Sequence, residues 1–238
     1  MKRFYRDVTI DSGPSGFRVL LDDRPMRTPA KAELILPTRR LAEAIAAEWR
    51  NVPDKAEVKV AHLALTRLAT TGMDRVTPQR EAVIGDTAKY AGSDLLCYRA
   101  TDPESLVKRQ HEAWQPLLDW AARRYGAPLV VAAGTSFVTQ SADSVSRLTA
   151  AVAGHSDLAL SALYNLTHVC GSLVIALAVA EGRLSAETAF AVAQLDELYQ
   201  IERWGDDPLA LERRTGIRND IEAAARFLAL LEDARRKG

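Results

Sequence analysis

The chain has 238 residues, enough for one large domain or two modest ones, each with its own hydrophobic core. Its composition, 47% hydrophobic and 26% charged, is that of a globular protein in water. The formal net charge is +0 and the pI is about 6.9, which argues against a nucleic-acid partner because such proteins carry a basic footprint.

The first sixty residues predict a small antiparallel sheet followed by one helix. Two strand-like runs, 4–10 and 17–21, flank the turn-rich segment 11–16, and a third short apolar run follows them. Thr38 then suits the N-cap of a helix whose apolar stripe includes Trp49. The indole of Trp49 is expected to pack between this helix and the sheet.

From His62 onward helical periodicity dominates the sequence. Thr77 is expected to cap a helix that has Pro78 at its first position, and Gly126 is expected to end another. The expected helices begin or extend over 77–90, 103–125, 141–153, 157–181, 185–204 and 208–236. We therefore expect an α+β fold, with a small antiparallel β-rich N-terminal domain containing one helix (residues 1–60) and a larger all-helical C-terminal domain (residues 61–238).

One uncharged segment raises the question of a transmembrane helix. From Leu158 to Ala180 there is no charged residue, which is long enough for a membrane span. The run contains several polar residues, and its ends lack an aromatic belt and a basic flank. A buried central helix, apolar on all sides because other helices surround it, is the favoured interpretation.

The cysteines and the N-terminal residues indicate the cellular compartment of the protein. Cys97 and Cys170 are far apart and match no zinc or redox spacing, so we expect reduced thiols. The first residues contain neither an apolar signal region nor a long basic amphipathic leader. The sequence favours a cytoplasmic protein.

Motifs of common enzymes are missing from the sequence. There is no dinucleotide-binding glycine motif, phosphate-binding loop, nucleophile elbow or His-Glu-x-x-His pattern. The pair His168 and Cys170 lies on poorly matched helical faces for a metal. We expect no metal and no cofactor, and a binding role is favoured over catalysis.

The segment from Leu195 to Asp207 has charged and aromatic residues on helix faces where they are unusual. At about 100° per residue, Glu202 falls on the apolar face with Leu195 and Leu198, whereas Trp204 points the other way. A carboxylate facing the core and an indole facing water suggest a binding surface rather than a folding requirement. The residues expected to bind a partner are Asp196, Glu197, Glu202, Trp204, Asp206 and Asp207.

Three interpretations of Glu202 remain open at this point. It can contribute to a partner-binding surface, or act as the general acid or base of a helical enzyme because an apolar environment raises the pKa of a carboxyl group. It can also be a buried structural carboxylate paired with an arginine such as Arg99.

Four stretches of the sequence resemble a known family. The string from Ala91 to Ala100, with Asp94, Tyr98 and Arg99, is similar to the tyrosine–aspartate–leucine–tyrosine–arginine motif of the ATP synthase assembly chaperones that handle the alpha subunit. These are called F-ATPase assembly factor two in mitochondria. Further similar stretches begin at Gly171-Ser172, at Leu195 and at Ala47-Glu48-Trp49, although Asn51-Val52 replaces the glutamine that usually ends the last motif. The motif residues Trp49, Asp94, Tyr98, Arg99, Gly171 and Ser172 are expected to be structural.

The resemblance implies a function. Such a chaperone holds the free alpha subunit of the catalytic head until beta subunits replace it, and it hydrolyses no ATP. The implied partner is therefore the ATP synthase alpha subunit, bound by a chain that is monomeric when free. Family members occur in the mitochondrial matrix and in bacteria, and the missing presequence favours a bacterial cytoplasmic member.

Overall fold

The structure is a computed structural model, and it describes residues 2–54, 56–59, 62–134, 136–205 and 207–232. Packing divides the chain into two compact units. The first unit comprises Met1–Arg80, Ser156–Ala162 and Arg226–Gly238, and the second comprises Glu81–His155 and Leu163–Ala225. The predicted domain boundary between residues 60 and 61 falls inside the first unit, and the division into domains 1–60 and 61–238 stays a prediction.

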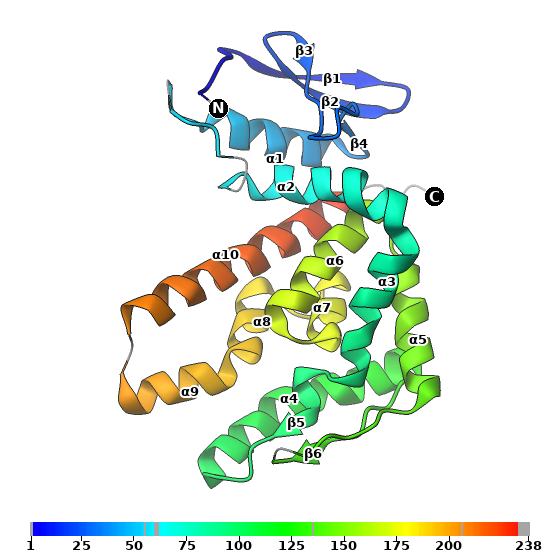
Figure 1. The fold of residues 1–238 in the computed structure, drawn as a ribbon, viewed down its shortest axis with the longest axis vertical. Helices are drawn as coiled ribbons and strands as arrows, with labels where there is room; N and C mark the ends of the chain where they lie inside the picture. The colour runs from blue at the N-terminus through cyan, green and yellow to red at the C-terminus, as the bar shows by residue number, and fades with distance from the viewer. Residues whose placement is uncertain (1, 55, 60–61, 135, 206, 233–238) are drawn as a thin grey trace. The chain divides into compact units, whose positions relative to one another are not determined.

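The first unit contains the predicted antiparallel sheet (Figure 1). Its strands are β1 (Val8–Gly13), β2 (Gly16–Leu21), β3 (Arg24–Pro25) and β4 (Ile35–Leu36). β1 and β2 form a hairpin in which Gly13 lies opposite Gly16, so the segment 11–16 is mostly strand rather than turn. β2 also pairs with β3 and β4. Gly16 has φ +132°, and a Cβ there would lie 2.6 Å from the Leu36 carbonyl oxygen, so only glycine suits this position.

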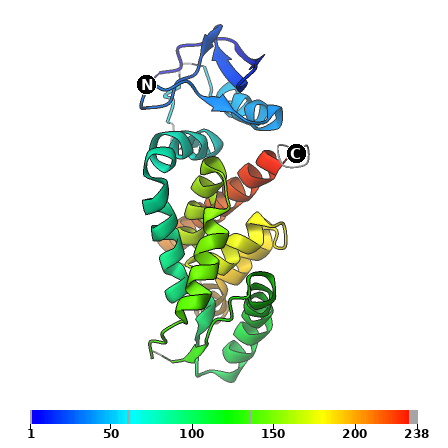
Figure 2. The same cartoon turned by 90° about the vertical axis from the view of Figure 1, so that its right-hand side faces the viewer.

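Helix α1 (Arg39–Arg50) packs against the face formed by β1 and β2, as Figures 1 and 2 show. The predicted cap is confirmed, because the Thr38 hydroxyl accepts a hydrogen bond from the Leu41 amide at 3.2 Å. Leu41 and Ile45 of α1 are fully buried, which accounts for the apolar stripe in the sequence.

The helical backbone does not begin at Thr77 as predicted. Helix α2 (Ala64–Thr71) continues through a π-helical turn, Gly72–Val76, and a 3-10 turn, Thr77–Gln79. The Thr77 hydroxyl donates to the Gly72 carbonyl at 3.1 Å instead of capping a new helix. The wider π turn accommodates the proline at position 78, which has no amide hydrogen to donate.

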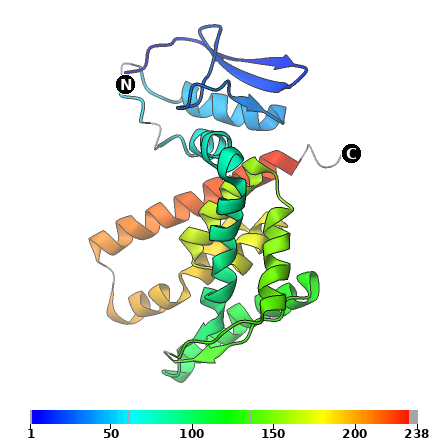
Figure 3. The same ribbon diagram turned by 45° about the vertical axis from the view of Figure 1, so that its right-hand side comes forward.

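Helices dominate the chain after residue 80. They are α3 (Arg80–Ala88), α4 (Glu104–Tyr125), α5 (Ala142–Ala153), α6 (Asp157–Cys170), α7 (Leu173–Ala180), α8 (Ala186–Ala193), α9 (Leu195–Trp204) and α10 (Pro208–Leu231). Gly126 ends α4 in the left-handed conformation with φ +65°, as predicted. A short parallel pair, β5 (Tyr98–Arg99) and β6 (Ala132–Ala133), accompanies α4 (Figure 3). The predicted end of the last helix, Arg236, lies outside the described residues. The predicted α+β class is confirmed, but the β5–β6 pair shows that the region after residue 61 is mostly helical and not all-helical as predicted.

Two predicted helices are each broken in the structure. The uncharged run forms α6 and α7, separated at Gly171, which has φ +65°. The predicted helix 185–204 is broken at Gln194, where α8 ends and α9 begins. Within the described part of the chain, no helix combines the length and the apolar character that a membrane crossing requires. The uncharged run is instead buried, since every residue from Leu173 to Val179 lies in the protein interior.

Candidate partner-binding site

Helix α9 is attached to α4 through one buried side chain, Tyr199. Its hydroxyl forms a 2.6 Å hydrogen bond with Ser105 Oγ on α4. The guanidinium groups of Arg109 and Arg203 lie 5.2 Å and 4.6 Å from the centre of the tyrosine ring. These distances fit cation–π contacts, which add to the apolar burial of the ring. Tyr199 therefore fixes which faces of α9 point toward α4 and which point to solvent.

Two of the predicted carboxylates, Asp196 and Glu202, face α4. Gln110 Nε2 donates to Asp196 Oδ1 at 2.8 Å, and Arg109 Nη1 donates to Glu202 Oε2 at 2.7 Å. The Glu202 side chain is 55% exposed, so the prediction that it points into the core is wrong. The phase of the helix was predicted correctly, but the apolar core ends at Tyr199 and Glu202 lies one turn beyond it.

Trp204 is on the outward side of α9, as its helical phase predicts, with 77% of its surface exposed. Glu197, which shares that side, is also exposed. Asp207 lies at the start of α10, where its Oδ1 accepts from the Leu209 amide at 2.9 Å. Asp206 lies outside the described residues. The predicted acidic surface is thus divided, with Asp196 and Glu202 bound to α4 and with Glu197 and Asp207 exposed to solvent.

Two functional candidates were missed by sequence reasoning, Leu209 and Leu211. They are 78% and 54% exposed in the first turns of α10, close in sequence to Trp204 at the reversal between α9 and α10 (Figure 3). A signal for them exists in the sequence, because neither falls on the apolar stripe of this helix, which consists of Ile217, Ile221, Ala224, Leu228 and Leu231. An apolar residue off the buried stripe of a helix is exposed unless another element covers it.

Asp94 is a fully buried carboxylate that holds two segments of the second unit together. It accepts hydrogen bonds from Ser172 Oγ at 2.7 Å, the Val174 amide at 3.0 Å and the Leu96 amide at 3.1 Å. Ser172 is itself the N-cap of α7, and Gly171 accepts from the Leu95 amide at 3.0 Å. The two matching stretches of sequence therefore meet at the start of the buried helix α7.

Arg99 is buried beside α4, whereas its neighbour Tyr98 is half-buried. Arg99 Nε donates to the Leu96 carbonyl and Arg99 Nη1 to the Gln110 carbonyl, both at 2.9 Å. The guanidinium also lies 5.3 Å from the Trp114 ring centre, and burial lowers the pKa of Arg99. This arginine joins the β5 strand to α4 and does not pair with Glu202.

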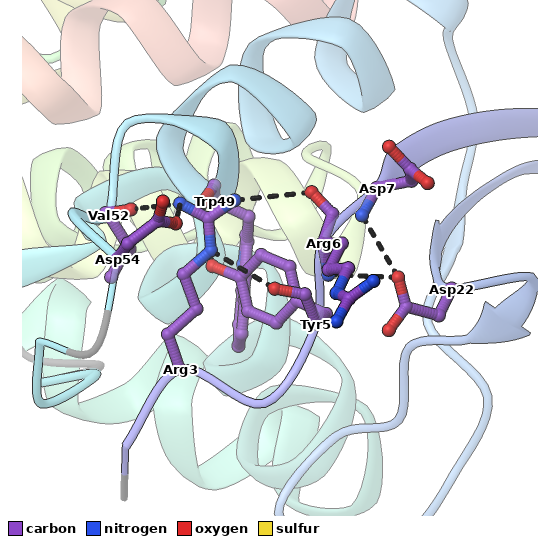
Figure 4. Close-up of polar contacts among 8 residues, drawn as sticks. All are labelled: Arg3, Tyr5, Arg6, Asp7, Asp22, Trp49, Val52 and Asp54. Carbon is purple, nitrogen blue, oxygen red and sulfur yellow. Dashed lines mark hydrogen bonds and ion pairs between the residues drawn. The ribbon is translucent and has the colours of Figure 1, made fainter.

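Trp49 lies in the first unit and its predicted burial is confirmed, with 6% of its surface exposed; its indole contacts Tyr5 and α2, and its packing against the sheet stays a prediction. Figure 4 shows Tyr5 beside it, and the Tyr5 hydroxyl donates to the Trp49 carbonyl at 2.7 Å. The indole Nε1 donates to Thr66 Oγ1 at 3.1 Å. The preceding residue, Glu48, accepts from the Leu65 and Thr66 amides at 2.7 Å and 2.9 Å. Glu48 thus binds the first turn of α2, a role that the sequence did not reveal.

Comparison with known proteins decides which family these features belong to. Residues 2–122 match the family model described as ATP12 chaperone protein. The crystal structure of Atp12 from Paracoccus denitrificans is 41% identical, covers 97% of this chain and 98% of its own, and superimposes with a TM-score of 0.90. The chain belongs to the ATP12 chaperone family. A point mutant of the Paracoccus protein has the same TM-score and covers 97% of each chain at 41% identity. The mitochondrial protein atp12 of Schizosaccharomyces pombe is 22% identical over 98% of this chain and 84% of its own length.

Membership of the ATP12 family settles one of the open alternatives. The family consists of non-enzymatic factors for ATP synthase assembly, so the hypothesis of a helical enzyme using Glu202 is wrong. Burial raises the pKa of both the Cys97 and the Cys170 thiol to about 12. Such thiols stay protonated at neutral pH and are poor nucleophiles.

Proposed function

We propose that this ATP12 family member binds the free alpha subunit of ATP synthase and covers its subunit interface until beta subunits replace it. An unpaired alpha subunit exposes a large apolar interface, which favours aggregation. A chaperone that covers such a surface reversibly needs apolar anchors surrounded by polar groups.

The observation that carries this proposal is a set of exposed apolar side chains close together in the sequence, Trp204 at the end of α9 with Leu209 and Leu211 in the first turn of α10, called here the α9–α10 corner. Large apolar side chains exposed close together in the sequence are typical of interaction sites, and tryptophan is enriched among residues that dominate binding energy. Two acidic residues near the corner in the sequence, Glu197 on α9 and Asp207 before α10, are also exposed. This composition suits a partner surface that is apolar at its centre and basic at its edge.

The function is tested by light scattering of refolding alpha subunit in the presence of this chain. We expect the wild-type chain to suppress scattering and to release no phosphate from ATP. The variant Trp204→Ser should suppress scattering only at about tenfold higher concentration, because it loses the main apolar anchor. Phe137→Ser is the matched control, since Phe137 is similarly exposed at 73% but lies between α4 and α5.

Two outcomes of this assay contradict the proposal in different ways. Unchanged scattering with wild-type chain in several-fold molar excess would show that the alpha subunit is not the client. Equal activity of Trp204→Ser and wild type, with loss of activity in Phe137→Ser, would move the binding surface away from the α9–α10 corner.

A second prediction concerns the charge of Glu202, which we propose also contributes to binding. The variant Glu202→Lys should change the free energy of unfolding by less than about 1 kcal/mol, because the ion pair with Arg109 is half-exposed. It should weaken binding of the alpha subunit by more than about tenfold, because it places a cation where the proposal expects the partner's cations. Thermal melting and a binding titration on the same preparation check both statements, and normal binding by a normally folded variant would contradict the role of Glu202.

A further inference from the structure

An open groove lies between α4 and the segment that joins α8 to α9. Its volume is about 420 Å³, within the range of about 300–1,000 Å³ that is typical of binding sites. The groove is lined by Arg109, Glu112 and Ala113 of α4, Ala191 and Val192 of α8, and Leu195 of α9. It lies on the α4 side of α9, whereas Trp204 points away from α4, so the groove is separate from the α9–α10 corner.

The groove exists because small side chains lie where the helices approach each other. Trp114 Nε1 donates to the Val192 carbonyl at 3.0 Å, which holds the end of α8 against α4. Above this contact, Ala113 is half-buried and Ala191 is exposed, so neither fills the space between the helices. The surface of the groove is consequently mostly apolar and is accessible to a side chain from another protein.

The charges beside the groove differ in how well they are compensated. Arg109 is neutralised by Glu202 at 2.7 Å and lies against the Tyr199 ring. Glu112 has a weaker partner, because its distance to Lys108 Nζ is 3.9 Å and its side chain is 62% exposed. The charge that remains available to a ligand in the groove is therefore the carboxylate of Glu112.

We propose that this groove binds an apolar side chain of the client protein that has a lysine or arginine close to it in the same segment. The apolar side chain occupies the space above Ala113 and Ala191, and the cation pairs with Glu112. This inference rests on the proposed function, which makes the client the free alpha subunit. It adds a second contact site to the α9–α10 corner and specifies the chemistry of the client segment that occupies it.

Filling the groove tests the proposal. The variant Ala191→Trp should weaken binding of purified alpha subunit by about tenfold or more, because the indole occupies the space that the client's apolar side chain needs. Its melting temperature should match that of wild type, since residue 191 is exposed on α8. The matched control is Ala150→Trp, an exposed alanine of α5 outside the groove, which should bind like wild type.

The charge requirement is tested separately with Glu112→Lys, compared with Glu222→Lys at an exposed position of α10. We expect Glu112→Lys to weaken binding by about fivefold or more and to make it less sensitive to salt, while Glu222→Lys changes neither. Equal effects of the two variants would overturn the pairing of the client's cation with Glu112.

Photo-crosslinking reports which segment of the client lies beside the groove, in addition to the binding strength. A thiol-reactive benzophenone will attach only to the thiol that Ala191→Cys introduces, because Cys97 and Cys170 are buried. It should crosslink to an alpha-subunit segment that has an apolar residue beside a lysine or arginine, and a label on Ala150→Cys should not. No binding by the wild-type chain would overturn both this inference and the proposed function. If the wild-type chain binds, Ala191→Trp binds equally well and position 191 gives no crosslinks, the role of the groove is overturned but the proposed function is not.

Discussion

Replacing Trp49 by arginine is expected to lower the free energy of unfolding by about 3–5 kcal/mol. The substitution removes a buried indole and its hydrogen bond to Thr66, and it leaves a guanidinium among apolar residues of α1 such as Ile45. A loss of this size is a large fraction of the stability of a typical domain. We therefore expect most of the variant to be recovered in the pellet, with the remainder melting far below wild type.

The conservative variant Trp49→Phe separates packing from charge. Phenylalanine keeps most of the apolar contact with Tyr5 and loses only the indole hydrogen bond, so we expect a loss of about 1–2 kcal/mol. Denaturant titration of both variants measures the difference. A Trp49→Arg chain that unfolds at the wild-type denaturant concentration but fails to bind alpha subunit would show that Trp49 belongs to the interface and not to the core.

The regular elements of this chain were largely predictable because each depends on residues close together in the sequence. Two strand-like apolar runs predicted the antiparallel sheet that contains β1 and β2, and the stripe behind Thr38 predicted α1 and its cap. The break between α6 and α7 was missed because it depends on Asp94, a residue nearly eighty positions earlier that accepts hydrogen bonds from the first turn of α7. Periodicity within one segment contains no information about such a distant partner.

The candidate site, too, was predictable only in part from the sequence. Helical phase correctly placed Trp204 on the solvent side of α9, since phase is a property of the helix alone. Phase could not show that the core ends at Tyr199, so it left open whether Glu202 is a buried structural carboxylate, whereas the structure shows the side chain half-exposed beside Arg109. The groove beside Ala191 was also beyond prediction, because it arises from three helices whose positions depend on packing across the unit.

Replacing Asp94 by alanine is expected to lower the free energy of unfolding by about 3–5 kcal/mol. The variant leaves the Leu96 and Val174 amides buried without an acceptor and deprives Ser172 of its partner. Denaturant titration measures the loss, and Asp143→Ala is the matched control because Asp143 lies in the first turn of α5 with its side chain 71% exposed. A loss no greater than that of the control would show that α7 does not depend on this carboxylate.

The same carboxylate should also make stability depend on pH. Burial raises the pKa of Asp94 from 3.8 to about 6, against the opposing effect of its hydrogen bonds from Val174, Ser172 and Leu96. Because the folded state binds the proton more tightly than the unfolded state, this contribution to stability is complete below about pH 3.8 and is lost as the pH rises through about 6.

Between pH 5 and pH 7.5 the wild-type chain should therefore lose on the order of 1 kcal/mol of unfolding free energy relative to Asp94→Asn, whose side chain does not titrate. Denaturant titrations of both chains at the two pH values measure this difference, and the carboxyl carbon resonance of Asp94 should titrate with a midpoint near 6. A midpoint close to the ordinary value of 3.8 would show that the hydrogen bonds to the ionised carboxylate outweigh its burial, and that the start of α7 is equally stable across this pH range.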